Sequence, residues 1–175
     1  IKEVMTLDPK DCPDMLYFIP CPKSPHGCDV DPTGEYIVGS GKLAAVIPVF
    51  SFSKMIKAIA ANKFDGEFES IPVLNYEAVL HGEVQKPGLG PLHTEFDGQG
   101  NAITSFFVSS ELVIWNIEKL EVVDRVPTYY SVGHLSIPGG PTMKPHGKYV
   151  IAYNKITKDR YLPTGPELAQ SAQLY

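Results

Sequence analysis

The stretch Asp31-Pro-Thr-Gly-Glu-Tyr-Ile-Val38 contains a turn, with glycine at its fourth position, that runs directly into a β-branched segment. The same pattern returns in Asp97-Gly-Gln-Gly-Asn-Ala-Ile-Thr104 and in Lys144-Pro-His-Gly-Lys-Tyr-Val-Ile151. Glycine tolerates the left-handed backbone of tight turns, and β-branched residues favour strands. The sequence therefore predicts one turn–strand unit that occurs three times.

The spacing of these turns indicates the architecture. The turn glycines Gly34, Gly100 and Gly147 are separated by 66 and 47 residues. A repeat of about 45 residues, with four short strands per unit, is typical of the blades of a β-propeller. Within the longer first interval, residues 53–62 place apolar side chains at helical spacing after a serine. We expect this segment to be a short helix inserted between strands.

These patterns predict an all-β fold that is part of a β-propeller, with about three blades and a short helical insertion. At least two four-stranded antiparallel blades and part of another are expected. Each blade needs neighbours that cover both of its faces, and three blades do not close a ring. The predicted strands include residues 36–40, 44–50, 102–108, 112–115 and 149–153.

Composition limits the possible functions. The 175 residues are 43% hydrophobic and 20% charged, which is typical of a globular protein. The net charge of -5 gives no electrostatic attraction to nucleic acid or to an anionic membrane. No apolar run approaches the roughly 18 residues that a membrane span requires. The three cysteines do not have the spacing of a zinc motif; they are Cys12, Cys21 and Cys28.

Three of the five histidines lie at related positions in the repeat. His26, His93 and His134 each precede one of the repeated turns. Equivalent positions in successive blades lie on one ring around the propeller axis, so these imidazoles are predicted to converge, as a metal site requires. Imidazole alone does not identify the metal, because it suits zinc, copper, iron and nickel. His81 follows no repeat rule and His146 lies inside a turn, so both are interpreted as structural.

Several longer motifs resemble nitrous oxide reductase, in that family's order and across nearly the whole chain. The distances between the motifs differ from better-known members, which indicates a divergent branch. The motifs are Pro25-His-Gly-Cys-Asp29, Gly39-Ser-Gly-Lys-Leu43, Gly88-Leu-Gly-Pro-Leu-His-Thr-Glu-Phe-Asp-Gly98, Gly133-His-Leu135 and Asn154-Lys-Ile-Thr-Lys-Asp-Arg-Tyr-Leu-Pro-Thr-Gly-Pro166.

The resemblance implies a seven-bladed propeller whose centre holds CuZ, a tetranuclear copper-sulfide cluster bound by seven histidines. By local motif, His26, His93 and His134 match three of these ligands. Lys155 matches a lysine near the cluster on the substrate side. The resemblance also implies calcium binding near Lys155, with Glu167 as a substitute for the acidic residue that the family would place at Gln170.

The resemblance further implies an oxidoreductase of denitrification that reduces nitrous oxide to dinitrogen. Such enzymes are periplasmic homodimers that receive electrons from a small cytochrome c or cupredoxin. Residues 1–175 would be one part of the propeller domain, and the cupredoxin domain with its CuA copper is absent from them. With three of seven ligands, this fragment is expected to be inactive alone.

Two other functions remain open at this stage. One is a non-catalytic β-propeller that binds partners and carries no metal. The other is a propeller hydrolase that uses zinc or calcium, for which Asp29 and Glu95 are the best-placed carboxylates. The position of the three histidines discriminates between these hypotheses, because a histidine on an outer strand would favour the binding module.

Overall fold

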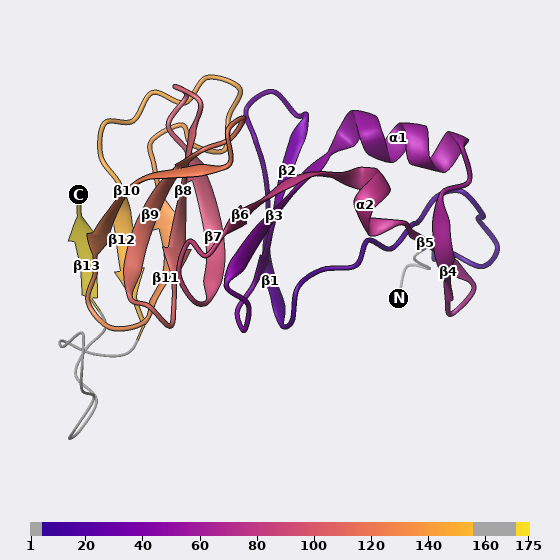
Figure 1. The fold of residues 1–175 in the computed structure, drawn as a ribbon, viewed down its shortest axis with the longest axis horizontal. Helices are drawn as coiled ribbons and strands as arrows, with labels where there is room; N and C mark the ends of the chain where they lie inside the picture. Colours follow the sequence, from indigo (N-terminus) through magenta and orange to yellow (C-terminus); the bar gives the residue numbers. More distant parts are fainter. Residues whose placement is uncertain (1–4, 156–170) are drawn as a thin grey trace.

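The computed structural model describes residues 5–155 and 171–175 and consists mainly of antiparallel sheets that stand side by side (Figure 1). We number these sheets as blades. Blade 1 has its strands in the order β1 (Pro25–Val30), β2 (Tyr36–Gly41), β3 (Val46–Ser51) and β6 (Leu80–Gln85).

Blades 2 and 3 are simple meanders, in which consecutive strands pair. Blade 2 contains four strands and blade 3 contains three within the described residues, so the predicted fold class is confirmed. The strands of blade 2 are β7 (Pro91–Phe96), β8 (Asn101–Phe106), β9 (Glu111–Asn116) and β10 (Glu121–Pro127); those of blade 3 are β11 (Val132–Ser136), β12 (Ile151–Asn154) and β13 (Ser171–Leu174).

Two of the three predicted turns form as expected. Gly34 and Gly100 have φ angles of 77° and 89°, in the region that favours glycine. Each turn is fastened by its aspartate: the Asp31 carboxylate accepts hydrogen bonds from the amides of residues 33 and 36, and Asp97 does the same for residues 99 and 101. These side-chain bonds mimic a backbone turn.

The third turn differs from the prediction. Lys144 stands where the other two turns have aspartate, so no carboxylate is available to bind the turn amides. A long loop leaves β11, and β12 begins only at Ile151. In this loop the left-handed glycine is Gly139, with φ 74°, rather than Gly147.

The insertion, residues 52–79, separates β3 from β6. Its helix α1 (Phe52–Ala60) confirms the predicted helix, although Ser51 and not Ser53 caps it, with the Ser51 hydroxyl accepting from Lys54 N. The helix packs on blade 1 through a cluster that includes Phe50, Met55 and Leu74. The other elements of the insertion are β4 (Phe64–Phe68), β5 (Ile71–Leu74) and α2 (Tyr76–Val79).

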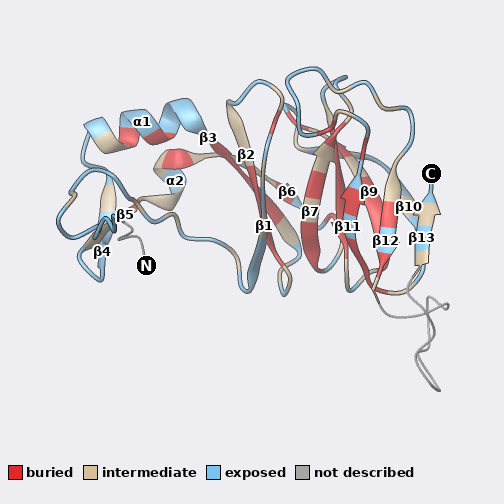
Figure 2. Cartoon of the chain, turned by 180° about the vertical axis from the view of Figure 1, so that it is seen from behind, coloured by how far each residue is buried: buried red, intermediate tan, exposed pale blue. Residues whose placement is uncertain are grey.

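Blade 2 buries both of its faces (Figure 2). One face forms a cluster with blade 1, in which Val113 and Trp115 are 0% exposed. The other face packs on blade 3 through Ile103 and Leu112. The Trp115 indole donates a hydrogen bond to Thr104 Oγ1 over 2.9 Å, so its buried N–H is satisfied. The core therefore consists of apolar layers between neighbouring blades.

No helix in residues 5–155 or 171–175 has the length and apolar character needed to cross a bilayer.

A buried and an exposed valine of blade 2 predict different costs for the same substitution. Val113→Ala removes buried methyl groups from the layer against blade 1 and is expected to lower the free energy of unfolding by about 2 kcal/mol. Val123→Ala, on a side chain that is 60% exposed, is the matched control and should change it by less than about 0.5 kcal/mol. Urea denaturation of both variants measures the difference. Equal effects would contradict this assignment of the core.

Candidate metal centre

The first strand of each blade lies next to the first strand of the following blade. We call β1, β7 and β11 the inner strands, because β1 contacts β7 and β7 contacts β11. Their histidines are brought together. The ring centroids of His26 and His93 are 4.9 Å apart with the rings edge to face, and those of His93 and His134 are 4.1 Å apart with the rings stacked.

A β-bulge occurs at the histidine of every inner strand. The pairing with the second strand of the blade shifts register between Pro25 and Cys28, between Pro91 and Thr94, and between Val132 and Leu135. The extra residue of a bulge re-aims the side chains of its strand. The three blades thus have the same irregularity in their first strands. The sequence patterns did not predict it.

The bulges are not identical in register. In blade 1 the histidine is the first of the two bulged residues and Gly27 the second. In blades 2 and 3, His93 and His134 are the second. His26 nevertheless reaches the ring of His93, because Gly27 has no side chain. A Cβ at Gly27 would stand 1.9 Å from Leu92 O, so the backbones of β1 and β7 approach each other closely here.

Lys155 lies beside this histidine group. A Cβ on Gly133 would meet Lys155 Cε at 2.1 Å, so the lysine side chain passes directly over Gly133 and next to His134. The backbone of Lys155 is tied to the same blade, because Lys155 N donates to Ser131 O over 3.0 Å. An open pocket of about 350 Å³ lies here, lined by His134, Tyr153, Asn154, Lys155, Ser171 and Ala172.

The surroundings favour the neutral form of two of the imidazoles, those of His93 and His26. Burial, followed by the neighbouring His134, His26 and Lys155, lowers the pKa of His93 to about 4. Burial also lowers the pKa of His26, and Lys155 and His134 act in the same direction. Within the described residues, His93 Nε2 is buried and has no hydrogen-bond partner. Neutral imidazole with a free nitrogen is the form that binds a metal.

Two carboxylates flank the histidines further along the inner strands. Asp29 Oδ2 accepts from Thr94 N over 2.7 Å and so joins β1 to β7. Burial raises the pKa of Asp29, which the bond from Thr94 opposes. Burial and the Asp29 charge raise the pKa of Glu95 to about 7. The carboxylates predicted for a hydrolase are therefore close to the histidines, with Asp29 already used in joining two blades.

The remaining histidines lie elsewhere. His81 is on β6, the outermost strand of blade 1, with its ring 4.7 Å from that of Tyr36. His146 is exposed in the loop between β11 and β12. Glu167 and Gln170, named for calcium, lie outside the described residues.

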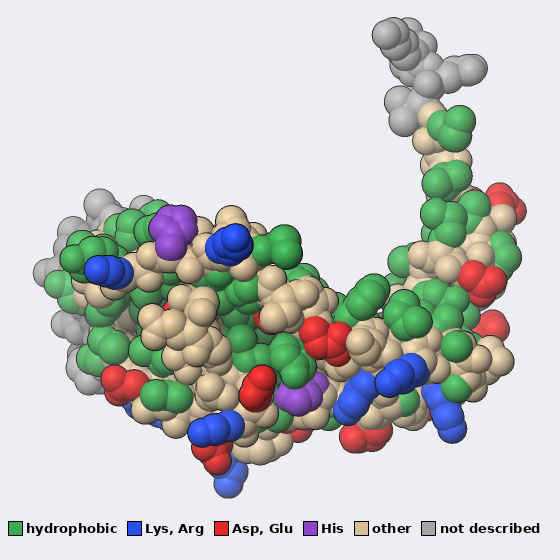
Figure 3. Space-filling model, turned by 90° about the horizontal axis from the view of Figure 1, so that it is seen from above, with side chains coloured by type: hydrophobic (Ala, Val, Ile, Leu, Met, Phe, Trp, Pro, Cys, Tyr) green, Lys and Arg blue, Asp and Glu red, His purple; other side chains and the backbone are tan. Residues whose placement is uncertain are grey.

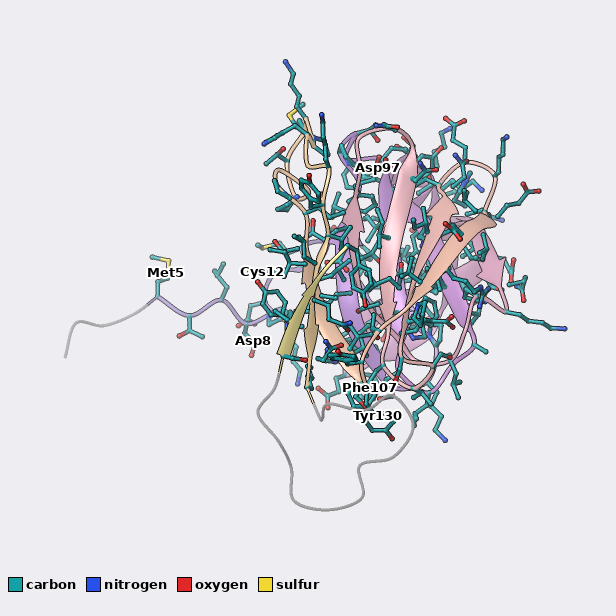
Figure 4. All side chains as sticks on the ribbon, turned by 90° about the vertical axis from the view of Figure 1, so that its left-hand side faces the viewer. Met5, Asp8, Cys12, Asp97, Phe107 and Tyr130 are labelled. Atoms are coloured by element: carbon teal, nitrogen blue, oxygen red, sulfur yellow. The ribbon has the colours of Figure 1, made fainter. Side chains whose placement is uncertain are left out.

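The histidine group lies at one end of the blades. In Figure 4, Asp97, which follows β7, marks one end of the blades. Phe107 and Tyr130 mark the other end, where β7 and β11 begin and where the histidines lie. The histidine side chains visible on the face shown in Figure 3 lie apart from one another. Lys42 also lies at the histidine end, with its Nζ 4.3 Å from the centre of the Phe107 ring.

The sequence did not reveal two serines that contact these bulges. Ser40 and Ser105 lie on the second strands of blades 1 and 2 and are 3% and 0% exposed. Gly27 N donates to the Ser40 hydroxyl over 2.5 Å, and His93 N donates to the Ser105 hydroxyl over 3.3 Å. Their position opposite each bulge depends on strand register, so no local sequence pattern marked them.

The fold and the gathered imidazoles define a segment of a β-propeller with a candidate metal centre on its inner strands. In the part of the chain that the structure describes, His, Cys, Asp and Glu side chains form no group of three that could hold a single metal ion. His26, His93 and His134 all lie on inner strands and none lies on an outer strand. The geometry therefore does not favour the binding-module hypothesis.

Comparison with known proteins identifies the family. A family model described as "Nitrous oxide reductase propeller repeat" matches residues 125–175. The nitrous-oxide reductase of Stutzerimonas stutzeri is 34% identical over 167 residues, which is 90% of this chain and 24% of that protein. That of Cupriavidus necator is 35% identical over 178 residues, which is 95% of this chain and 26% of that protein.

The chain belongs to the nitrous oxide reductase family, as part of its propeller, and the resemblance seen in the motifs is confirmed. It spans about a quarter of the length of the curated relatives it matches. A solved structure described as Kuenenia stuttgartiensis hydrazine synthase aligns with a TM-score of 0.57 at 13% identity, over 86% of this chain and 33% of that chain. This second likeness concerns the fold alone.

The close approach at Gly27 predicts a specific sensitivity. Gly27→Ala places a methyl group against Leu92 O, so β1 must move away from β7, at a cost of about 1–3 kcal/mol in unfolding free energy. Gly34→Ala is the matched control: it has φ 77° but open space around it, and should cost about 1 kcal/mol of local strain. Crystal structures should show the rings of His26 and His93 further apart only in Gly27→Ala. An unchanged ring distance in that variant would contradict the argument.

Proposed function

We propose that this chain supplies His26, His93 and His134 as ligands of a tetranuclear copper-sulfide cluster in a protein that reduces nitrous oxide to dinitrogen. The observation that carries the proposal is the meeting of three imidazoles from three successive blades at one end of the inner strands. The family of the chain supports the same reaction.

The donor set fits a copper cluster. The three imidazoles are nitrogen donors in mutual contact, and imidazole suits copper. The buried, unpartnered Nε2 of His93 is available to a ligand. The rings of His93 and His134 pack against each other, and within the described residues no three such side chains form a set for one ion. A hydrolase with a single zinc or calcium ion gains no support from this arrangement.

The protein residues would hold the site in place and shape it. When bound, the cluster supplies electrons to nitrous oxide, which is kinetically inert. The inner strands fix the imidazoles before any ligand arrives, because both faces of blade 2 are packed. The buried layers keep water away from the blade interior, and this strengthens electrostatic interactions nearby.

Lys155 is proposed to act on the substrate side of the site and not as a ligand. Its ammonium passes over Gly133 toward a pocket that His134 also lines. There it can donate a hydrogen bond to the oxygen of nitrous oxide as negative charge develops on that atom. An ammonium suits this role because it has three N–H donors and no acceptor.

The wider biology of the protein is proposed from its family. We infer a periplasmic homodimer in denitrification that takes electrons from a small cytochrome c or cupredoxin through a CuA copper in a cupredoxin domain. Calcium would bind near Lys155 and Glu167. Residues 1–175 alone are proposed to be inactive, since they contain three of the seven ligands.

Replacing the three histidines tests the ligand assignment. In the intact protein, His26→Ala, His93→Ala and His134→Ala should each lower the copper content and abolish nitrous oxide reduction, because each removes a nitrogen donor. His146→Ala, in an exposed loop, is the control and should retain both. Copper analysis of the four purified variants is the measurement. Full copper in the first three would remove these residues from the ligand set.

Replacing Lys155 separates catalysis from copper binding. Lys155→Met keeps the aliphatic stem but removes the donor, and should lower kcat by roughly 100-fold or more, as loss of one donor to a developing negative charge does. Copper content and cluster absorption should stay at the wild-type level. Lys148→Met, on an exposed lysine, is the control. An unchanged kcat for Lys155→Met would exclude the proposed role.

A further inference from the structure

We propose that Ser40 and Ser105 are positioning residues for the copper ligands: their hydroxyls stabilise the bulges that orient His26 and His93. This inference rests on the proposed ligation of copper by these histidines.

The two serines occupy equivalent places in their blades. In blade 1, Gly39 pairs with Cys28 and Gly41 pairs with Pro25, so Ser40 faces the bulged residues His26 and Gly27. In blade 2, Thr104 pairs with Thr94 and Phe106 with Pro91, so Ser105 faces Leu92 and His93. Each serine therefore stands opposite two bulged residues, where the regular ladder has no backbone partner to offer.

The hydroxyls replace the missing ladder bonds. Ser40 accepts from Gly27 N over 2.5 Å and lies 3.2 Å from Gly27 O, to which it can donate. Both backbone groups of one bulged residue are satisfied by a single side chain. A buried N–H or C=O without a partner is costly, so the bulge depends on a small side chain that both accepts and donates.

Ser105 connects the backbones of β7 and β11. It accepts from His93 N over 3.3 Å, and its single proton has two possible acceptors, His93 O at 3.5 Å and Gly133 O at 2.5 Å. The shorter contact identifies Gly133 O as the acceptor. Gly133 immediately precedes His134, so one hydroxyl links the backbone of His93 to the backbone beside His134 in the next blade.

Other contacts of β7 restrict the backbone on either side of His93. Leu92 O lies against Gly27, and Thr94 N donates to Asp29. His93 N, between them, has the Ser105 hydroxyl as its partner. Without that hydroxyl, the bulge loses the bond at the residue that carries the imidazole. In blade 3 the residue facing the bulge is Tyr153, so this bulge has no serine opposite it.

The experiment uses the intact, copper-loaded protein. Ser105→Ala is expected to release copper to a chelator about 10–100 times faster than wild type and to shift the cluster absorption, as loss of a residue that orients metal ligands does. Ser105→Thr keeps the hydroxyl and should retain copper close to the wild-type rate. Ser51→Ala is the matched control: it removes a buried serine hydroxyl that bonds Glu35 and Lys54, away from the inner strands.

The outcomes separate this inference from the function on which it rests. If His134→Ala loses copper but Ser105→Ala matches Ser51→Ala in copper release and absorption, the positioning role is overturned and the ligand assignment stands. If His134→Ala keeps its copper, the ligand assignment itself fails. If Ser105→Ala does not fold, Ser40→Ala is compared with Ser51→Ala by the same two measurements, with the same expected direction.

Discussion

The structure depends on the burial of both faces of blade 2. Its central strands β8 and β9 place apolar residues on each side, and these pack against blade 1 in one direction and blade 3 in the other. Burial at about 25 cal/mol per Å² makes these layers the main stabilising contribution of the fold. Because the layers fix the blades at contact distance, their inner strands meet, and residues far apart in sequence become neighbours.

The candidate metal centre follows from that contact, together with an irregularity. A regular strand would send alternate side chains to the two faces of its sheet. The bulge in each inner strand changes this alternation at the histidine, and burial lowers the pKa of His93 and of His26. Glycine at position 27 then lets two backbones approach within a distance that excludes any side chain. The site is therefore formed by packing, bulges and one absent side chain acting together.

The sequence predicts two turns, the helix and the meeting of the histidines, but not the inner strands or the serines that face the bulges. The Asp31 and Asp97 turns and the helix were predictable, because turn residues and helical spacing are local signals. The inner strands were not, since His, Gly and polar residues dominate them and their burial comes from the neighbouring blade. The third turn fails because Lys144 lacks a carboxylate. The meeting of the three histidines followed from the repeat, but the serines facing the bulges depend on strand register, which local patterns do not specify.

The position of the insertion has a consequence for how relatives of this chain should be compared. Residues 52–79 enter between the third and fourth strands of blade 1, whereas the histidine lies at the start of the first strand. Insertions at that outer edge lengthen the polypeptide and change its overall shape, while the residues on the inner strands keep their relative positions. Overall length is consequently a poor criterion for judging whether a homologue retains the candidate metal centre. The pairing at the start of blades 1 and 2, with histidine in the bulge and a serine opposite it, is the more reliable signature to search for.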